Sequence, residues 1–384
     1  MKQKPNIVVN KNTPNAMQVF SSIGNVIGLD TQETTREAVR EAEILIVRSE
    51  VRIDSNLLEG SRVRFVGTVT SGIDHVDTGY LASKGIVFAH AAGSNANSVA
   101  EYIAAALLHW SGRTGKGLAG KTIGVVGIGN VGSRVVEVAK IFGMHVLMND
   151  PPRARATRGN EFRPLDDLME ADIVTLHVPL TASGGDHTYH LFDAERISRM
   201  KRGAVLINTA RGAVADTEPL RDALASGHLS AAILDVWEGE PAIDTPLMDL
   251  AMLATPHIAG YSLDGKLNAL RMVYEEVCKF LGIKKEWNVS VDPPREVACV
   301  GVDRNLVDSL EICGLAVRRA YDIELDDRLL RRISSIKDGQ RYFREMRANY
   351  RVRREFPNWT LDLSRPQLHA RPLLGGLGFR TRAR

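Results

Sequence analysis

The sequence predicts an α/β protein built on doubly wound parallel sheets. Short apolar runs rich in β-branched residues alternate with longer segments that have helical periodicity. The short runs are continuously apolar, which is typical of strands that helices cover on both faces of a parallel sheet. A chain of 384 residues also exceeds what one hydrophobic core usually serves, so we expect more than one domain.

Composition favours a globular protein and excludes several functional classes. Hydrophobic residues make up 44% and charged residues 25%, and a formal charge of +3 is too small to indicate nucleic acid or a membrane surface as a partner. No apolar run approaches the roughly 18 residues that a transmembrane helix needs. The amino-terminal segment has too few consecutive apolar residues for a signal peptide. No metal-ligand spacing relates the cysteines, so we expect reduced thiols in a cytoplasmic protein: Cys278, Cys299 and Cys313.

The first domain is predicted from five apolar runs near the start of the chain. We expect strands over residues 6–10, 25–29, 44–49, 64–72 and 86–91. The segment 97–111 follows, with alanine and leucine throughout, and it predicts a buried helix.

A second series of strands begins at residue 121 and predicts a complete doubly wound domain. The later strands of this series are expected at residues 145–150, 172–177, 204–208, 230–236 and 252–255. Because open α/β sheets bind ligands at the carboxyl ends of their strands, the residues directly after these runs are the candidates for a site.

The last third of the chain completes the domain pattern. Residues 262–283 predict an amphipathic helix that returns to the first domain, since apolar residues recur there at intervals of three and four. Residues 291–384 contain 19 basic and 13 acidic residues and predict a third domain, in which residues 375–384 show no clear element. The expected domains span residues 1–95 with 259–290, 96–258, and 291–384.

A glycine-rich turn predicts a dinucleotide site after the first strand of the second series. Gly127 permits a tight turn, Gly129 lets the backbone approach a pyrophosphate, and Gly132 lets the helix pack on the strand. The helix amino terminus, with Asn130 and Val131 in its first turn, supplies N–H groups and partial positive charge for phosphates.

An acid at the end of the next strand favours NAD over NADP. Asp150 lies 18 residues beyond Gly132, where a carboxylate can bond the ribose hydroxyls and repel a 2′-phosphate. Arg153 and Arg155 lie close by in the sequence, and either one is a possible phosphate partner. NADP therefore stays open as an alternative.

Three polar residues after strands predict a hydroxy-acid oxidation site. Removing hydride from a secondary alcohol leaves a proton on oxygen, so a base near neutrality is needed, and His257 fits this role. A carboxylate at Glu240 would orient the imidazole and stabilise its protonated form. Arg211 can hold a substrate carboxylate through two hydrogen bonds.

Other candidate constellations are weaker. The segment with Asp74, His75 and Asp77 lacks a converging ligand set, so we expect structural hydrogen bonds and no metal site. His187 and His190 lie in a polar loop, where we expect both to face water.

At this point the motifs support a family resemblance. The glycine motif with its Asp, then NTARG, DVWEGEP and TPHIAG, resembles the D-2-hydroxyacid dehydrogenase family. This resemblance implies that His257 is the acid/base, Glu240 its partner and Arg211 the substrate anchor. Formate dehydrogenases of the same superfamily carry Gln in place of this Glu, so that branch is disfavoured.

Within the family, the chain looks most like the members that oxidise 4-phospho-D-erythronate in pyridoxal phosphate biosynthesis. FVGTVTSGIDHVD, NDPPR, TPHIAGYSLDGK and NYRVRREFPNW are similar to those proteins. The resemblance implies NAD-dependent formation of (R)-3-hydroxy-2-oxo-4-phosphooxybutanoate. It also implies a flavodoxin-like substrate domain, a Rossmann NAD domain and a carboxyl-terminal α+β domain that forms a homodimer.

The resemblance also assigns binding residues. Substrate contacts would fall on Ser49, Thr70, Ser71, Gly72 and Tyr261. Further NAD contacts would fall on Asp150, Val178, Asp235 and Gly260, with Val178 acting through its backbone. The segment AAGSNANSVAEY departs from the Cys-Asn pattern of those proteins, although Asn95 remains.

The phosphate site has two candidate sources. One is a polar or basic residue of the same chain, with Arg48, Ser49 and Lys266 as candidates. The other is an arginine of a partner subunit from Arg351, Arg353 and Arg354, although these residues are equally well explained as ion pairs on helix surfaces.

Two rival functions stay open. One is oxidation of another hydroxy acid, of the glycerate or phosphoglycerate type. The other is an NAD(H)-responsive binding protein like the transcriptional corepressors that share this fold and can keep the catalytic trio. The matching third domain argues against the corepressor alternative.

Overall fold

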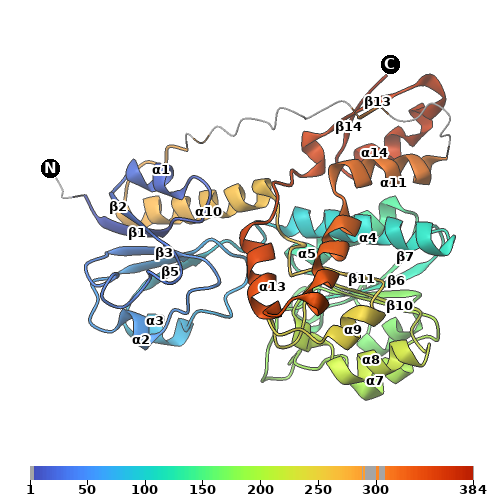
Figure 1. Ribbon diagram of the computed structural model, residues 1–384, viewed down its shortest axis with the longest axis horizontal. Helices are drawn as coiled ribbons and strands as arrows, with labels where there is room; N and C mark the ends of the chain where they lie inside the picture. The colour runs from blue at the N-terminus through green and yellow to red at the C-terminus, as the bar shows by residue number, and fades with distance from the viewer. Residues whose placement is uncertain (1–3, 288, 290–299, 302–307, 384) are drawn as a thin grey trace. The chain divides into compact units, whose positions relative to one another are not determined.

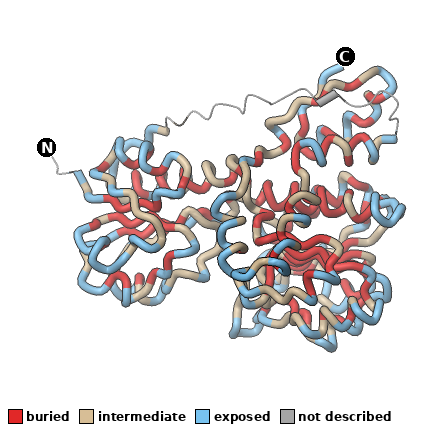
Figure 2. Tube along the Cα trace, in the orientation of Figure 1, coloured by how far each residue is buried: buried red, intermediate tan, exposed pale blue. Residues whose placement is uncertain are grey.

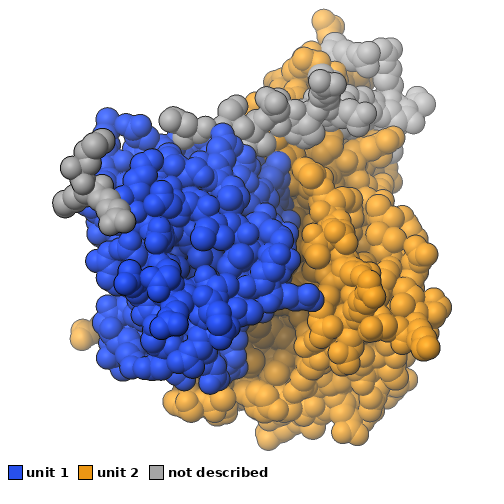
Figure 3. Space-filling model, turned by 60° about the vertical axis from the view of Figure 1, so that its left-hand side comes forward, with its two compact units in different colours: residues 1–95, 262–292 blue, residues 96–261, 293–384 orange. Residues whose placement is uncertain are grey.

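The computed structural model describes residues 4–287, 289, 300–301 and 308–383. The chain forms two compact units, coloured separately in Figure 3. Unit 1 contains Met1–Asn95 and Ser262–Asp292, and unit 2 contains Ala96–Tyr261 and Pro293–Arg384. Residues 293–384 are therefore grouped with the central segment, and their status as a separate dimerisation domain stays a prediction.

Unit 1 is a parallel five-stranded sheet with the order β2-β1-β3-β4-β5. This order is the flavodoxin-like one and confirms the predicted fold. Its strands are β1 (Asn6–Asn10), β2 (Asn25–Leu29), β3 (Ile44–Val47), β4 (Phe65–Thr68) and β5 (Val87–His90). β3 and β4 are buried along their whole length, as their uninterrupted apolar sequences predict.

Helices cover the sheet of unit 1. They are α1 (Ala16–Ser21), α2 (Ser55–Leu58), α3 (Thr78–Ser83) and α10 (Leu263–Leu281). The predicted return helix, α10, begins at the N-cap Ser262 and ends at Gly282, whose φ of 65° suits a left-handed cap. It packs on β4 and β5. A Cβ at Gly67 would lie 2.5 Å from Val273 Cγ1, so glycine at this position allows the helix to approach β4.

Unit 2 contains the predicted six-stranded parallel sheet, in the order β11-β10-β9-β8-β6-β7. The strands are β6 (Thr122–Val126), β7 (His145–Asn149), β8 (Ile173–Leu176), β9 (Val205–Asn208), β10 (Ala231–Leu234) and β11 (Leu253–Ala254). The chain adds β7 on one side of β6 and then crosses to add β8 on the other. The turn after β6 therefore lies at the switch point where such sheets bind ligands.

The helices of unit 2 lie around this sheet (Figure 1). They are α4 (Ala96–Thr114), α5 (Asn130–Ile141), α6 (Pro151–Thr157), α7 (Ala194–Arg199), α8 (Thr217–Ala225) and α9 (Thr245–Leu250), with the short 3₁₀ turns η1 (Leu165–Glu170) and η2 (Gly212–Val214). The predicted buried helix is α4, which packs against α5 and α11 and is buried along most of its length. Figure 2 shows the same concentration of buried residues in α4 and the strands.

The carboxyl-terminal part of unit 2 is helical with a small parallel sheet. Its elements are β12 (Val300–Gly301), α11 (Ser309–Ala320), α12 (Ile323–Arg331), η3 (Arg332–Ser335), α13 (Gly339–Ala348), η4 (Phe356–Asn358), β13 (Thr360–Leu363), η5 (Arg365–Ala370), α14 (Arg371–Gly376) and β14 (Arg380–Ala383). The prediction of no clear element over residues 375–384 is wrong, because β14 pairs with β13. An ion pair between Arg382 and Asp362 supports this pairing.

The cysteines and the helices can also be compared with what the sequence predicts. Cys278 and Cys313 are free and buried, and burial raises the pKa of Cys313 to about 12. Cys299 and the predicted linker 292–296 lie outside the described residues. Among the described residues, every helix is too short or too polar to span a lipid bilayer.

Packing of the carboxyl-terminal segment predicts a stability effect. Phe356 is fully buried and stacks on Phe379 with ring centroids 4.4 Å apart. We expect Phe356→Ala to lower the free energy of unfolding of unit 2 by about 3–5 kcal/mol, because it leaves a cavity. Urea unfolding followed by circular dichroism measures this change. Val352→Ala is the matched control, since Val352 is 71% exposed, and equal effects of the two substitutions would contradict the packing.

Candidate active site

The glycine turn after β6 has the backbone geometry that a dinucleotide requires. Gly127 has φ 88°, which favours glycine, and a Cβ at Gly132 would lie 1.8 Å from the Gly127 carbonyl oxygen. A Cβ at Gly129 would meet nothing within 4 Å, so this part of the turn is open. Asn130 and Val131 begin α5 directly after it. The turn therefore fits a pyrophosphate over the amino terminus of α5.

Asp150 lies against this turn. One carboxylate oxygen accepts the Ile128 amide at 2.8 Å, and the other accepts the Arg153 amide at 2.9 Å. A carboxylate accepts up to about four hydrogen bonds, so these contacts still allow a ribose hydroxyl to bind. The Arg153 guanidinium also donates to the Ile128 carbonyl, whereas Arg155 is paired with Asp186. Arg153 is thus the arginine next to the nucleotide turn.

His257 and Glu240 form the pair that the sequence predicts. His257 Nδ1 lies 2.8 Å from Glu240 Oε2, and Glu240 Oε1 accepts the Trp237 amide at 2.8 Å. Burial alone would raise the pKa of Glu240, but the adjacent His257 and the Trp237 amide hold this pKa below its usual range. Glu240 is therefore an anion that fixes the ring through Nδ1, and Nε2 is left for chemistry.

A buried carboxylate shapes the loop that carries His257. Asp235 is 1% exposed and accepts the Thr255 hydroxyl at 2.6 Å, the Ile258 amide at 2.8 Å and the Ala259 amide at 2.9 Å. His257 has φ 58°, in the left-handed region that a non-glycine residue rarely adopts. Asp235 thus acts as a loop anchor in the structure, and its contact with NAD stays a prediction.

Arg211 follows β9, at the same sheet edge as the Glu240 turn. Arg211 Nη1 donates to the Ala210 carbonyl at 2.8 Å, and Asn208 Nδ2 donates to the Arg211 carbonyl at 2.9 Å. A Cβ at Gly212 would lie only 1.9 Å from the backbone carbon of Trp237. The segment that carries Arg211 therefore packs directly against the segment that carries Glu240.

The structure brings one arginine to this site that the sequence did not single out. Arg347 Nη2 lies 3.2 Å from the Tyr261 hydroxyl, and its guanidinium is 5.8 Å from the ring centroid. Its charge also helps to lower the pKa of Glu240, after burial and the stronger partners. The available sequence signal was the apolar residue Phe343, four positions earlier on the same helical face. In the structure Phe343 is buried, and Arg347 therefore lies on the inward side of α13.

The arginines that the sequence did single out bond elsewhere within unit 2. They are Arg351, Arg353 and Arg354. Arg353 is 3% exposed and donates to the carbonyls of Ser98 and Ala259. Arg351 forms an ion pair with Asp326. These contacts favour structural roles over the partner-subunit hypothesis, and they link the carboxyl-terminal segment to the loop after His257.

Unit 1 holds a second group of candidate residues. Lys266 lies in the first turn of α10, and burial together with the nearby Arg48 lowers its pKa to about 8. Arg48 follows β3 directly, and its Nη2 lies 3.6 Å from Glu50 Oε1, while the next residue, Ser49, is exposed. Two cations close to one another in a partly buried position provide the charge that an anion would need.

The predicted carboxylate loop follows β4 in unit 1. Thr70 Oγ1 donates to the Gly72 carbonyl at 2.8 Å and lies 2.7 Å from Thr68 Oγ1. Ser71 Oγ accepts the Gly93 amide at 3.0 Å. The loop is therefore held by its own side chains, while contact with a substrate stays a prediction.

Val178 and Gly260 are two further predicted NAD contacts, and both lie in unit 2. The Val178 side chain is close to the nucleotide turn, because a Cβ at Gly127 would lie 2.8 Å from Val178 Cγ1. Gly260 follows the anchored loop and precedes Tyr261, whose amide donates to the Ile258 carbonyl at 2.8 Å. Their contacts with cofactor stay predictions.

The remaining histidines and acids were predicted to make structural hydrogen bonds or to face water. His75 Nε2 lies 3.0 Å from Thr68 Oγ1, and Asp77 caps α3 by accepting the Tyr80 amide, so both make structural hydrogen bonds as predicted. His187 is exposed. The expectation that His190 faces water is wrong, because this half-buried ring lies between two carboxylates. The polar sequence around His190 gave no sign of partners 26 and 48 residues away.

Comparison with known proteins supports one family along nearly the whole chain. Erythronate-4-phosphate dehydrogenase of Salinibacter ruber is 43% identical, with 97% of each chain covered. The protein of the same name from Chromohalobacter salexigens is 42% identical, with 98% of each chain covered. The chain belongs to the erythronate-4-phosphate dehydrogenase family. Residues 293–374 also match a domain of unknown function.

The NAD-binding half of this family member has a broader match. Residues 91–259 match the NAD-binding domain of D-isomer-specific 2-hydroxyacid dehydrogenases. The solved D-lactate dehydrogenase of Aquifex aeolicus, complexed with NAD and lactic acid, is 28% identical with a TM-score of 0.61, covering 72% of this chain and 95% of that one. The predicted Rossmann domain and NAD as its cofactor are thereby confirmed.

The position of Asp150 predicts cofactor discrimination. We expect Asp150→Ala to raise the ratio of NADPH to NADH affinity about tenfold, because a charge-assisted hydrogen bond and a repulsion of 2′-phosphate are both lost. Fluorescence titration with the two reduced cofactors measures the ratio. Asp166→Ala is the control, since this acid pairs with Arg199 on the exposed surface. An unchanged ratio in folded Asp150→Ala would place the discrimination elsewhere.

Proposed function

We propose that this chain catalyses NAD-dependent oxidation of 4-phospho-D-erythronate at its 2-hydroxyl, giving (R)-3-hydroxy-2-oxo-4-phosphooxybutanoate for pyridoxal phosphate biosynthesis. The observation that carries the proposal is the 2.8 Å pair of His257 and Glu240 in the NAD-binding unit. Support for the substrate comes from the family, whose members match nearly the whole chain.

The tautomer of His257 follows from its partner. Because the Glu240 carboxylate accepts a hydrogen bond at Nδ1, the neutral ring carries its proton there and presents an unprotonated Nε2. Nε2 takes the proton of the substrate 2-hydroxyl as the C2–H bond breaks. Bound NAD supplies the hydride acceptor for this step. Glu240 then stabilises the positive charge on the ring through the same hydrogen bond.

The two ends of the substrate need separate anion sites. Arg211 holds the carboxylate and polarises the developing carbonyl through its guanidinium. In unit 1, the family resemblance assigns carboxylate binding to the backbone amides near Ser71 and Gly72. We assign the phosphate to Arg48 and Lys266, because a bound dianion would relieve the repulsion between these cations. Arg347 and Tyr261 add a cation and a hydroxyl on the side of Glu240.

The proposal also covers how the chain assembles and where it is located in the cell. We propose a homodimer formed through residues 291–384, within a chain whose substrate, NAD and dimerisation domains have the bounds predicted above. Light scattering after size-exclusion chromatography measures the mass of the assembly against 42.2 kDa for one chain. A cytoplasmic location is supported by the two free, buried cysteines of the described chain.

Turnover assays separate this function from its rivals. Formation of NADH, followed at its absorbance near 340 nm, is measured with 4-phospho-D-erythronate, D-erythronate, glycerate and 3-phosphoglycerate. Preference for 4-phospho-D-erythronate supports the proposal, whereas preference for glycerate or 3-phosphoglycerate favours the sister enzymes. NADH-dependent binding of a protein partner without any turnover would favour the corepressor-like alternative.

The acid/base assignment predicts a separation of turnover from cofactor binding. We expect His257→Ala to lower kcat about 10²- to 10⁴-fold, because the proton of the substrate then has no base. The dissociation constant for NADH, from fluorescence titration, should stay within about twofold of wild type, since the imidazole acts on substrate. Loss of both turnover and NADH binding would show a structural role instead.

The depressed pKa of Lys266 predicts a pH effect on substrate affinity. Lys266 is charged below its pKa of about 8 and neutral above it, so kcat/KM for the phosphorylated acid should fall as pH rises from 7 to 9.5. Lys266→Arg should remove this fall, because arginine stays charged. Lys279→Arg, an exposed substitution on the same helix, is the control. A fall that persists unchanged in Lys266→Arg would exclude Lys266 as its source.

A further inference from the structure

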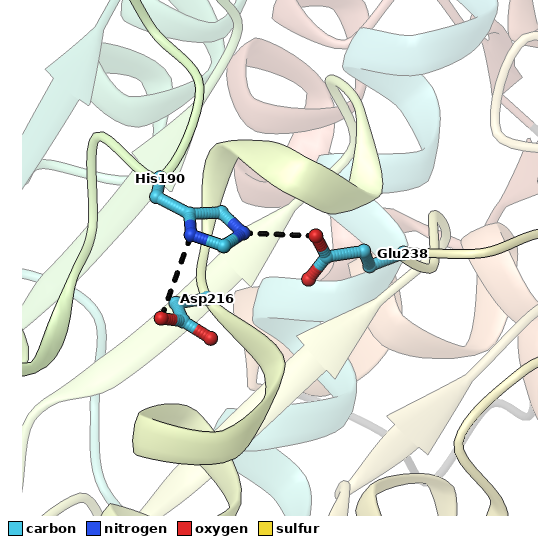
Figure 4. A group of neighbouring side chains, drawn as sticks. All are labelled: His190, Asp216 and Glu238. Atoms are coloured by element: carbon cyan, nitrogen blue, oxygen red, sulfur yellow. Dashed lines mark hydrogen bonds and ion pairs between the residues drawn. The ribbon is translucent and has the colours of Figure 1, made fainter.

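A charged cluster lies beside the proposed catalytic residues of unit 2 and has no part in the reaction described above. His190 Nε2 is 2.8 Å from Glu238 Oε1, and His190 Nδ1 is 3.5 Å from Asp216 Oδ2. Figure 4 shows the imidazole between the two carboxylates. The second Glu238 oxygen accepts the Thr217 hydroxyl at 3.0 Å. Three segments that are distant in sequence therefore meet at one half-buried ring.

The backbone joins the same segments. The His190 amide donates to the Ala213 carbonyl at 2.7 Å, and the Phe192 amide donates to the Val214 carbonyl at 2.9 Å. The Asp216 amide returns a bond to the Phe192 carbonyl at 3.0 Å. Residues 190–192 are thus fixed along the segment that begins at Arg211. His190 itself has φ 47°, a conformation that its surroundings must hold in place.

The other side of the cluster leads to the acid/base pair. Glu238 and Glu240 lie two residues apart on the turn after β10, yet they bond different groups. Glu238 bonds His190 and Thr217, whereas Glu240 bonds the Trp237 amide and His257. The turn is therefore held from two sides, and a shift at Glu238 would displace the carboxylate that orients the imidazole.

The arrangement favours an imidazole that bridges two carboxylates over a metal site. One nitrogen, one Asp oxygen and one Glu oxygen lie close enough together to surround a cation, and His190, Asp216 and Glu238 are the group in the described part of the chain with that geometry. A metal ion would need both carboxylates around a single ring nitrogen. Here each nitrogen faces a different carboxylate, as a ring that bridges two anions does.

We propose that His190 is a positioning residue, which clamps the Arg211 segment to the Glu240 turn and thereby keeps His257 oriented for proton transfer. This inference rests on the proposed function. Arg211 holds the substrate and Glu240 orients the base, so a clamp between their segments fixes the distance between substrate and base. Misplacement of reacting groups by about 1 Å can cost about a hundredfold in rate.

Three variants test the clamp in the full-length protein. His190→Asn removes the bridging ring while tolerating the left-handed backbone. His190→Arg supplies a long side chain with N–H donors for both carboxylates, and His187→Asn is the matched control on the same loop. We expect kcat to fall about tenfold or more in His190→Asn, with KM for NAD within about twofold of wild type. His190→Arg should recover most of the loss, and His187→Asn should match wild type.

Amide hydrogen exchange gives a readout that does not depend on the substrate. With NADH bound, exchange over residues 236–241 should rise about tenfold or more in His190→Asn, because the turn loses the bond from Glu238 to the imidazole and keeps only Thr217 as the side-chain partner of Glu238. Unchanged exchange over this segment overturns the clamp whether or not the wild-type protein turns over any hydroxy acid. Increased exchange together with an inactive wild-type protein would refute the proposed function and still support the clamp.

Three further results would reject the positioning role of His190. Exchange that rises throughout unit 2, with weaker NADH binding, would show that His190 has only a general structural role. A kcat in His190→Asn within twofold of wild type, measured on an active enzyme, would likewise reject positioning. Activity that a chelator removes and Zn²⁺ restores in wild type, but not in His190→Asn, would replace the clamp with a metal site.

Discussion

The buried carboxylate of Asp235 is the constraint on which the candidate site depends. It takes three hydrogen bonds from the loop between Thr255 and Ala259, and its position at the end of β10 is fixed by the central sheet. A charge at 1% exposure is tolerated because its oxygens are hydrogen-bonded. The left-handed backbone of His257 is part of the same loop. The position of His257 in the acid/base pair is therefore held by a carboxylate that does not touch the imidazole.

Parallel strands explain why residues so distant in sequence meet. Arg211, Glu240 and His257 each follow one of three neighbouring strands, β9, β10 and β11. Since the carboxyl ends of parallel strands share one edge, the order of the sheet brings these segments together. Gly212 then allows two of the segments to touch through their backbones. The order of the strands brings the three segments to one edge of the sheet, and glycine at position 212 allows two of them to approach closely.

Most of the fold was predictable because its signals are local. Every expected strand of both large sheets has a counterpart, since continuous apolar runs such as Ile44–Val47 mark strands that are buried on both faces. β14 was missed because its arginine-rich sequence lacks such a run and its partner β13 is about 20 residues away. A strand of this kind is defined by its pairing more than by its own composition.

The site was predictable only where a motif carried the chemistry. The glycine turn and the pair of His257 and Glu240 have recognisable sequences. Arg347 and His190 do not, because each acquires its role from partners far along the chain. Arginines 351 and 353 show the converse: their sequence suggested a ligand, yet packing directs them to carbonyls and a buried aspartate. Charge in a sequence identifies a candidate, and only tertiary structure shows what neutralises it.

The burial of α4 has a consequence for shorter members of the wider dehydrogenase group. This helix is apolar around most of its circumference, and α11 from the carboxyl-terminal segment covers part of it. A relative that ends before such a segment has no equivalent cover, so water or another element must meet that face. Where water meets that face in such a relative, we expect polar side chains at the matching positions of α4.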